Sequence, residues 1–276
     1  APGDALDDYQ ILEMVAERLG IKDQFTEGRT ADQWVEVLYE IFRAENDWAP
    51  NFEQFREAGY LRHPEMSEMG ENEQVFLAEY RDDPTVHPLG TPSGRIELWS
   101  ETIAEFDYDD CPPHPTWIEP FERLGGRGSE RWPLHLVSNQ PTSRLHSQYD
   151  HTEPSQGSKV AGREPIRIHP QIAEERGICD GDVVRVFNDR GTCLAGAVID
   201  DSLMPEVVQL STGAWYDPDD DGMCRAGNPN VLTRDKGTSQ LAQGPSAHTC
   251  LVEIERFEGA APRVESDDPP LFAVDG

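Results

Sequence analysis

The chain has 276 residues, enough for one large domain or two ordinary ones, and 53 acidic against 23 basic residues give it a formal net charge of -30. So negative a chain is a poor partner for nucleic acid or for an anionic membrane surface, because like charges repel. No apolar run approaches the roughly 20 residues that cross a bilayer, so the sequence predicts no membrane insertion.

Composition also indicates the surroundings of the protein. Only Lys22, Lys159 and Lys236 are lysines, and the other basic residues are arginines. An acidic, lysine-poor surface suits a medium of high ionic strength, where screening suppresses self-repulsion, so we expect a halophilic source. The five cysteines lack CxxC spacing, which predicts buried free thiols instead of disulfides, an iron–sulfur cluster or a zinc site.

The first sixty residues predict helices. Apolar residues recur at helical spacing from Leu12 to Leu19, and Gly20 ends that pattern. Thr30 and Gln33 suit a capping box ahead of a second, amphipathic helix. A third short helix is expected from Asn51 to Gly59. With no strands of their own to cover, these helices suggest the end of a larger α/β layer.

Residues 107–131 have the composition of a linker. Cys111-Pro112-Pro113-His114-Pro115 is stiff and Gly125-Gly126-Arg127-Gly128 is flexible, so we place a domain boundary here. The predicted organisation is an α/β remnant with its linker over residues 1–130, a mainly β barrel over 131–257, and a loosely held tail over 258–276.

Short strands are the main signal after this linker. Apolar alternation or continuous apolar runs predict strands over residues 132–137, 166–168, 182–187, 192–199, 206–211 and 251–257. One more strand is expected before the linker, over residues 95–99. Asn188 to Gly191 suits a hairpin turn, and Pro170 to Arg176 suits a brief helix. Short strands at this spacing favour a closed barrel over an open sheet.

A polar loop follows the strand expected at residues 132–137. Residues 138–148 read Ser-Asn-Gln-Pro-Thr-Ser-Arg-Leu-His-Ser-Gln. Amide and imidazole groups donate and accept hydrogen bonds along the edge of a heterocycle, and Arg144 can fork onto a phosphate. The alternative is a polar turn whose side chains cap their own backbone.

Two further loops between the predicted strands are rich in amides. They are Gly-Asn-Pro-Asn-Val-Leu-Thr at residues 227–233 and Gln-Leu-Ala-Gln-Gly at residues 240–244. Such amides pair in bidentate fashion with a purine or pterin edge, and the glycines admit a ligand close to the backbone. Each loop alone also fits an Asx turn. Three such loops in one small barrel favour a shared pocket.

Residues 217–222, Asp-Pro-Asp-Asp-Asp-Gly, match the first half of a calcium loop. The twelfth position is Asn228 instead of Glu and no helices flank the motif, so we do not expect calcium here. The histidines lack metal-ligand spacing, and the sequence has no P-loop or nucleophile elbow. No residue of this sequence is therefore assigned as catalytic or as a metal ligand.

Taken together, these motifs resemble a known family. The similarity lies in residues 138–148, 188–191, 209–218, 228–233 and 241–249, and it extends through 91–97 and the opening helices. They are similar to the C-terminal part of the molybdopterin oxidoreductases, in the branch of the dimethyl sulfoxide, trimethylamine N-oxide and biotin sulfoxide reductases.

The resemblance implies a fold and a cofactor. Residues from about 131 onward would form the molybdopterin-dinucleotide-binding domain, a double-psi β-barrel, after the end of a catalytic α/β domain. In such enzymes bis-molybdopterin guanine dinucleotide holds one Mo, a serine outside this region completes the coordination, and the metal removes oxygen from an S-oxide or N-oxide. By motif position, the cofactor-contacting residues would be Gln140, Arg144, His146, Ser147, Gln148, Asn228, Asn230 and Gln243.

The sequence departs from the family pattern by lacking its N-terminal half, with the metal-ligand serine and the substrate funnel. We therefore expect a fragment that is inactive alone and that works with the N-terminal catalytic portion of the same enzyme on a small S-oxide or N-oxide. The alternatives are a free-standing pterin- or nucleotide-binding module, a split subunit, and a barrel used for protein contacts. Relatives occur in cytoplasm and periplasm, so both compartments stay open.

Overall fold

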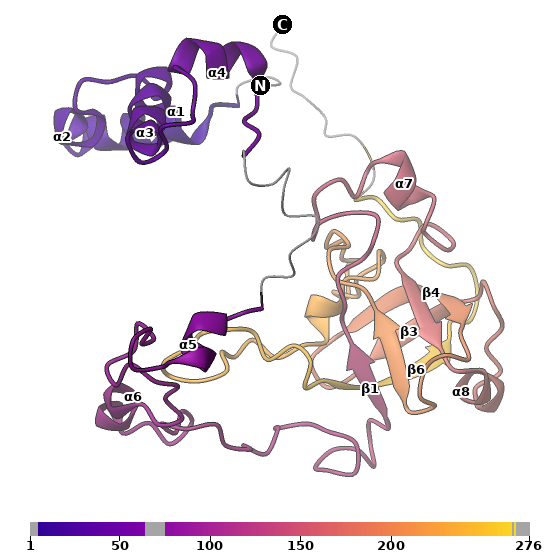
Figure 1. Ribbon diagram of the computed structural model, residues 1–276. Helices are drawn as coiled ribbons and strands as arrows, with labels where there is room; N and C mark the ends of the chain where they lie inside the picture. The colour runs from indigo at the N-terminus through magenta and orange to yellow at the C-terminus, as the bar shows by residue number, and fades with distance from the viewer. Residues whose placement is uncertain (1–4, 64–74, 267, 269–276) are drawn as a thin grey trace, which may run out of the picture. The chain divides into compact units, whose positions relative to one another are not determined.

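The computed structural model describes residues 5–63, 75–266 and 268. The chain divides into two compact units, Ala1–Ile96 and Glu97–Gly276 (Figure 1). The domain boundary expected near residue 130 stays a prediction, because compactness alone does not locate the boundary of a functional domain.

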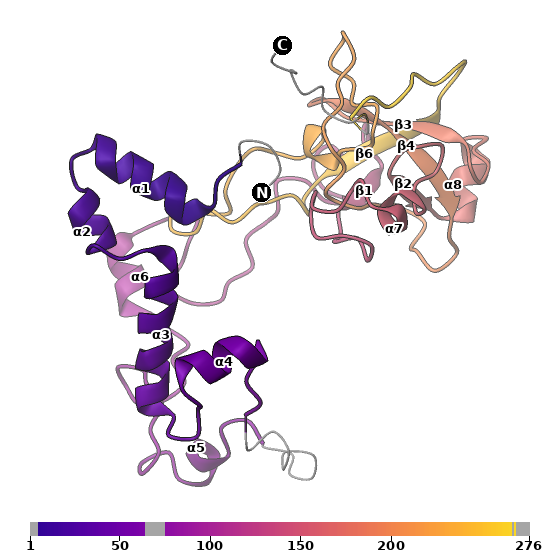
Figure 2. The same cartoon turned by 90° about the horizontal axis from the view of Figure 1, so that it is seen from above.

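The described part of the first unit is helical. Its helices are α1 Asp8–Arg18, α2 Lys22–Thr26, α3 Ala31–Glu45, α4 Phe52–Ala58 and α5 Ala78–Asp82. Helices α1, α3 and α4 each begin with a capping box, in which a side chain at the N-cap and a glutamine three residues later bond to each other's backbone N–H. Figure 2 shows α4 beside α3, where Tyr39 stacks on Phe55 with ring centroids 4.5 Å apart.

The apolar faces predicted for these helices are only partly covered. Leu12, Leu19, Leu38 and Ile41 are 51%, 67%, 62% and 58% exposed, whereas Ala16 and Tyr39 are buried. Helical spacing therefore predicted the helices correctly, but the described residues of this unit leave much of the apolar surface exposed. No strand is present in the described part of this unit, so an α/β character is not shown here.

The strand expected at residues 95–99 does not form. The carbonyl oxygen of Arg95 accepts a hydrogen bond from the Thr91 hydroxyl at 2.6 Å, within the Thr91-Pro92-Ser93-Gly94 turn. The backbone N–H of Ser100 donates to Pro113 O at 2.8 Å. Thr91 thus takes the one carbonyl of Arg95 that a ladder would use, and the short helix α6 Glu101–Phe106 follows, capped by the Ser100 side chain.

The second unit is built on a closed six-stranded barrel, which confirms the closed sheet predicted from the sequence. Its strands are β1 Leu134–Val137, β2 Pro165–Ile168, β3 Val183–Phe187, β4 Thr192–Ile199, β5 Val207–Leu210 and β6 Leu251–Arg256. They pair in the order β1-β5-β2-β4-β3-β6. β1 with β5 and β2 with β4 are parallel, and the other pairs are antiparallel.

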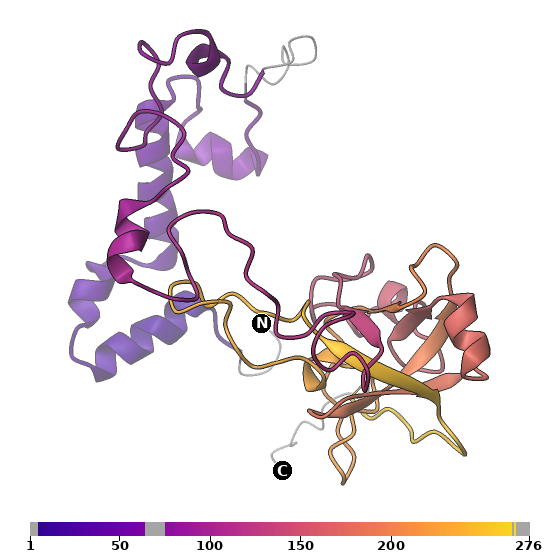
Figure 3. The same cartoon turned by 90° about the horizontal axis from the view of Figure 1, so that it is seen from below.

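Short helices fill the connections of the barrel. They are α7 Glu153–Gln156, α8 Pro170–Glu175 and the 3-10 turn η2 Pro229–Val231. The β3–β4 hairpin closes at Phe187 and Thr192 through the predicted turn, where Asn188 N–H donates to Gly191 O at 3.1 Å. Figure 3 shows residues 233–249 extending away from the barrel, and the Gln240 N–H of this loop donates to the Asp110 carboxylate at 3.2 Å.

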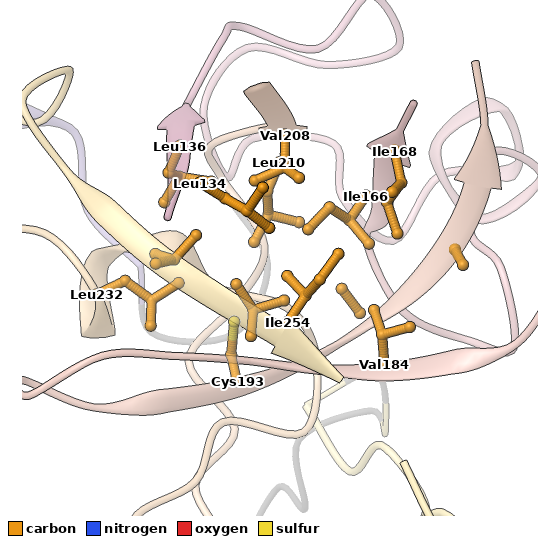
Figure 4. Close-up of a cluster of buried hydrophobic side chains, with 14 of the residues drawn as sticks. Leu134, Leu136, Ile166, Ile168, Val184, Cys193, Val208, Leu210, Leu232 and Ile254 are labelled. Atoms are coloured by element: carbon orange, nitrogen blue, oxygen red, sulfur yellow. The ribbon is translucent and has the colours of Figure 1, made fainter. Parts of the chain in front are cut away.

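Inward-facing aliphatic side chains fill the barrel (Figure 4). Leu136, Ile166, Val184, Val208 and Leu210 are fully buried, and alternate residues along each of their strands face outward. Each such side chain contributes about 1.5 to 3 kcal/mol on burial. The barrel therefore gives a rigid base for the loops that leave its strands.

All five cysteines are free thiols, as expected, but only Cys193, Cys224 and Cys250 are buried. Burial raises the pKa of the Cys250 thiol to about 11 despite the charge of Arg190 beside it. Cys179 is exposed.

The beginning of the predicted tail is held against the barrel. Arg163 donates to Pro262 O, and the Glu265 N–H donates to Asp217 Oδ2 at 2.8 Å. Arg225 pairs with the Glu265 carboxylate at 2.9 Å. This stretch is thus more firmly attached than its composition predicts, while residues 269–276 lie outside the described residues.

Candidate functional site

A cavity of about 410 Å³ opens where loops leave the barrel. Because β1 and β5 are parallel neighbours, the loops that follow them emerge at the same end of the sheet. The cavity is lined by His146, Ser147, Thr212, Gly213, Ala214, Trp215, Tyr216, Asn228 and Asn230. Two of the three polar loops found in the sequence therefore share one pocket.

The loops after β1 and β5 are bonded to each other. Thr212 N–H donates to Asn139 O at 2.9 Å, and the Ser211 hydroxyl donates to Asn139 Oδ1 at 3.1 Å. The Trp215 indole N–H donates to Ser147 O at 3.1 Å. These contacts fix the distance between the loops after β1 and β5, which form two walls of the pocket.

Gly213 brings these two walls into close contact. Its φ is +97°, and a Cβ at this position would lie 1.9 Å from the carbonyl oxygen of His146. His146 itself has φ +50°, a left-handed conformation that costs a non-glycine residue about 1 to 3 kcal/mol. A side chain at residue 213 would force the walls apart.

Asn228 and Asn230 supply amide groups to the pocket. Asn228 is largely buried, and its side-chain oxygen accepts from Asn230 N–H at 2.9 Å, which caps the 3-10 turn η2. The Asx turn expected as the plain alternative is thus present within the pocket wall. The side-chain oxygen of Asn228 thus accepts from the backbone, and its NH₂ group makes no hydrogen bond to another described residue.

Arg144 does not line the cavity. Its side chain is fully buried and lies 2.9 Å from Glu164 Oε2 and 3.4 Å from Asp150 Oδ1. It also donates to His146 O at 3.1 Å and to Thr212 O at 2.9 Å. The fork expected to meet a phosphate instead joins the protein's own carboxylates and carbonyls, and no Lys or Arg is among the described residues that line this cavity.

The remaining predicted contacts lie away from this cavity. Gln140 and Gln148 are exposed, and Gln243 donates to Ser239 O at 2.8 Å within its own loop. The sequence reasoning named none of Thr212 to Tyr216 as contacts. The signal was present, since a Ser-Thr-Gly-Ala-Trp-Tyr run directly follows an apolar strand.

A second cavity of about 490 Å³ borders the other side of the 138–148 loop. Asn139, Thr142 and Ser143 of this loop line it, together with the ion pair of Arg167 and Asp200, whose charged atoms are 2.8 Å apart. The loop therefore presents polar groups to two separate cavities.

The aspartates of the calcium-like motif serve the protein itself. Asp217 pairs with Arg225 at 2.6 Å, and Asp219 Oδ1 accepts from the backbone N–H groups of Asp221 and Met223 at 3.1 and 2.8 Å. The Asp217 carboxylate thus binds Arg225 and the backbone at Glu265, and the Asp219 carboxylate holds a turn.

Comparison with known proteins defines the class of domain. Residues 134–251, which span the barrel from β1 to the start of β6, match the family model described as the molydopterin dinucleotide binding domain. The structure of acetylene hydratase from Pelobacter acetylenicus shares the fold over 93% of this chain and 33% of that one, with a TM-score of 0.59 and 18% identity.

Among the curated relatives, the chain is similar to two kinds of reductase. It is 47% identical over 98% of its length to the dimethyl sulfoxide/trimethylamine N-oxide reductase of Cereibacter sphaeroides, and 46% identical over 95% to trimethylamine-N-oxide reductase 1 of Escherichia coli (strain K12). It spans about one third of the length of these relatives, 33% and 32%. The resemblance inferred from the sequence motifs is thus confirmed.

No described helix combines the length and apolar character needed to span a bilayer.

Proposed function

We propose that this chain is the C-terminal, cofactor-binding portion of a molybdenum S-oxide or N-oxide reductase. The observation that carries the proposal is 43% to 47% identity, over nearly the whole chain, to reductases of dimethyl sulfoxide and trimethylamine N-oxide. The rest of such an enzyme would be the catalytic partner, and the acidic, lysine-poor composition supports a source of high salinity.

The chemistry of the main cavity fits the heterocycle of a dinucleotide. The amides of Asn228 and Asn230 and the imidazole of His146 can pair with the donors and acceptors of a guanine or pterin edge. Trp215 and Tyr216, 46% and 56% exposed, offer flat faces for stacking. Binding of the bis-molybdopterin guanine dinucleotide form is supported by two cavities that share the 138–148 loop.

The sequence suggested that Arg144 would bind the diphosphate of the cofactor, and the structure favours a different residue. The guanidinium of Arg144 is bound by the protein's own carboxylates, so positive charge for a diphosphate would come from another residue. Arg167, which lines the second cavity and pairs there with Asp200, is a candidate. When bound, the cofactor would supply two-electron redox chemistry, and this chain would bind and orient it. The interleaved parallel pairs β1–β5 and β2–β4 support a double-psi arrangement of the barrel.

The test uses the full-length protein that contains this chain in its source cells. We expect about one molybdenum and two acid-released GMP per polypeptide. Asn230→Ala should lower the GMP and molybdenum retained after gel filtration, whereas Asn46→Ala, in the helical unit, should retain both. A full-length protein without molybdenum or GMP contradicts the proposal, and unchanged retention in Asn230→Ala removes this residue from the site.

A further inference from the structure

Four charged side chains are buried together beside the main cavity. Arg144, Asp150, Lys159 and Glu164 have side chains that are 0%, 2%, 5% and 2% exposed. The Lys159 ammonium lies 2.8 Å from Asp150 Oδ1 and 3.0 Å from Glu164 Oε2, so each carboxylate contacts both cations. The cluster is neutral overall, and it holds one of only three lysines in the sequence.

Such a cluster is a costly way to stabilise a fold. Each buried ion loses several kcal/mol of hydration, and well-packed apolar residues often stabilise a protein as much or more. Burial opposes ionisation of Asp150, but hydrogen bonds from Lys159 and Ser155 and the charges of Lys159 and Arg144 outweigh it and hold the pKa of this carboxyl below its ordinary value. The Asp150 carboxylate therefore stays charged, and the contacts of the cluster point to a geometric role.

The contacts of the cluster reach two cavity-lining residues, His146 and Thr212, and the residues directly before Asn228. Arg144 bridges the carbonyls of His146 and Thr212, which lie on either side of the contact between His146 and Gly213. Glu164 N–H donates to Ala226 O at 3.0 Å, and a Cβ on Gly227 would lie 2.8 Å from Glu164 Cβ. By contrast, the charged atom of Lys159 contacts the two carboxylates and neutralises them.

We propose that Arg144 is a positioning residue, which the carboxylates of Asp150 and Glu164 hold so that its fork sets the distance between the walls at His146 and Thr212 before any ligand binds. The planar guanidinium can span two carbonyls and two carboxylates at once, which a lysine cannot do. This role belongs to the ligand-free chain, so it stands whether or not the ligand is a molybdopterin dinucleotide.

The test is hydrogen exchange in the 276-residue chain carrying Arg144→Lys. This variant keeps the cluster neutral but loses the fork. The amides of Gln148 and Thr212 are hydrogen-bonded to Leu145 O and Asn139 O, so both have protection to lose. We expect both amides to exchange at least about tenfold faster in the variant. Losing hydrogen bonds to a charged group raises the equilibrium constant for local opening by about this factor or more. Amides in β3 should exchange as before.

The matched control is Arg185→Lys, which makes the same change in the exposed pair of Arg185 with Glu255, 2.7 Å apart. Exchange at residues 148 and 212 should not change in this control. Unchanged exchange in a folded Arg144→Lys protein overturns the proposal. GDP binding by the wild-type chain, measured alongside, reports on the proposed function alone, because the exchange result needs no ligand.

A second variant decides the case in which Arg144→Lys does not fold. Lys159→Met removes the cation whose charged atom contacts only the two carboxylates, and it keeps Arg144, both of its carboxylates and both carbonyl contacts. We expect this protein to fold and to retain slow exchange at Gln148 and Thr212. Fast exchange there, or failure to fold, would mean that the cluster acts only in stability, and the positioning role would be overturned.

Discussion

Gly213→Ala measures how much the close approach of the pocket walls constrains the barrel. At positive φ an alanine costs about 1 to 2 kcal/mol whatever its neighbours. At residue 213 the new Cβ must also move from 1.9 Å to at least 3.0 Å from His146 O, a shift of about 1.1 Å in packed backbone. Overpacking of this kind costs about 1 to 3 kcal/mol, so we expect a total loss of about 2 to 5 kcal/mol in the free energy of unfolding.

Gly222→Ala is the matched control, because its φ is +84° and nothing lies within 4 Å of the added Cβ. It should cost only the conformational part, about 1 to 2 kcal/mol. Urea titration followed by alkylation of the buried thiols of Cys193 and Cys250 reports on barrel unfolding alone. A Gly213→Ala protein no less stable than Gly222→Ala would refute the reasoning.

Two further changes test the barrel. Asn188→Ala removes the amide donor, 3.0 Å away, from the buried carbonyl of Leu251, whereas Arg190 still donates to Leu232 O at 2.6 Å. This change should cost about 1 to 3 kcal/mol in the same titration, against under about 0.5 kcal/mol for the exposed Asn230→Ala. Hydrogen bonds from Ser202 and Arg167 lower the pKa of Asp200 from 3.8 to about 2, so its stabilisation is complete above pH 3.8 and is lost as the pH falls through about 2. Asp200→Asn should therefore lose less unfolding free energy than the wild type as the pH falls across this window. If the free energy of unfolding of Asp200→Asn depends on pH as steeply as that of the control Asp201→Asn, this reasoning is wrong.

The barrel was predictable because its strands carry a period-two pattern that only burial on one side explains. Val184 and Val186 face the core, while Arg185 between them pairs outward with Glu255. Residues 95–99 have the same alternation but form no strand, since the Arg95 carbonyl is taken by Thr91 and none of the described strands pairs with this segment. Alternation predicts a strand only where a neighbouring ladder exists.

The pocket was only half predictable. His146 and Asn228 were recognised by their side-chain chemistry, which the structure brings to one cavity. The role of Arg144 could not be predicted, because its positive charge suits a phosphate ligand as well as a carboxylate of the protein itself. Its carboxylates at Asp150 and Glu164 lie 6 and 20 residues away along the chain, and nothing in the sequence indicates that they are buried with it.

The order of the strands has a consequence for how the chain is made. β6 joins β1 to β3, so the sheet formed by the first five strands has two open edges until Leu251–Arg256 has been synthesised. During translation the aliphatic side chains of β1 and β3 therefore lack their last neighbour, and exposed strand edges of this kind attract other chains. The ribosome must deliver almost the entire barrel before its interior can be sealed from water.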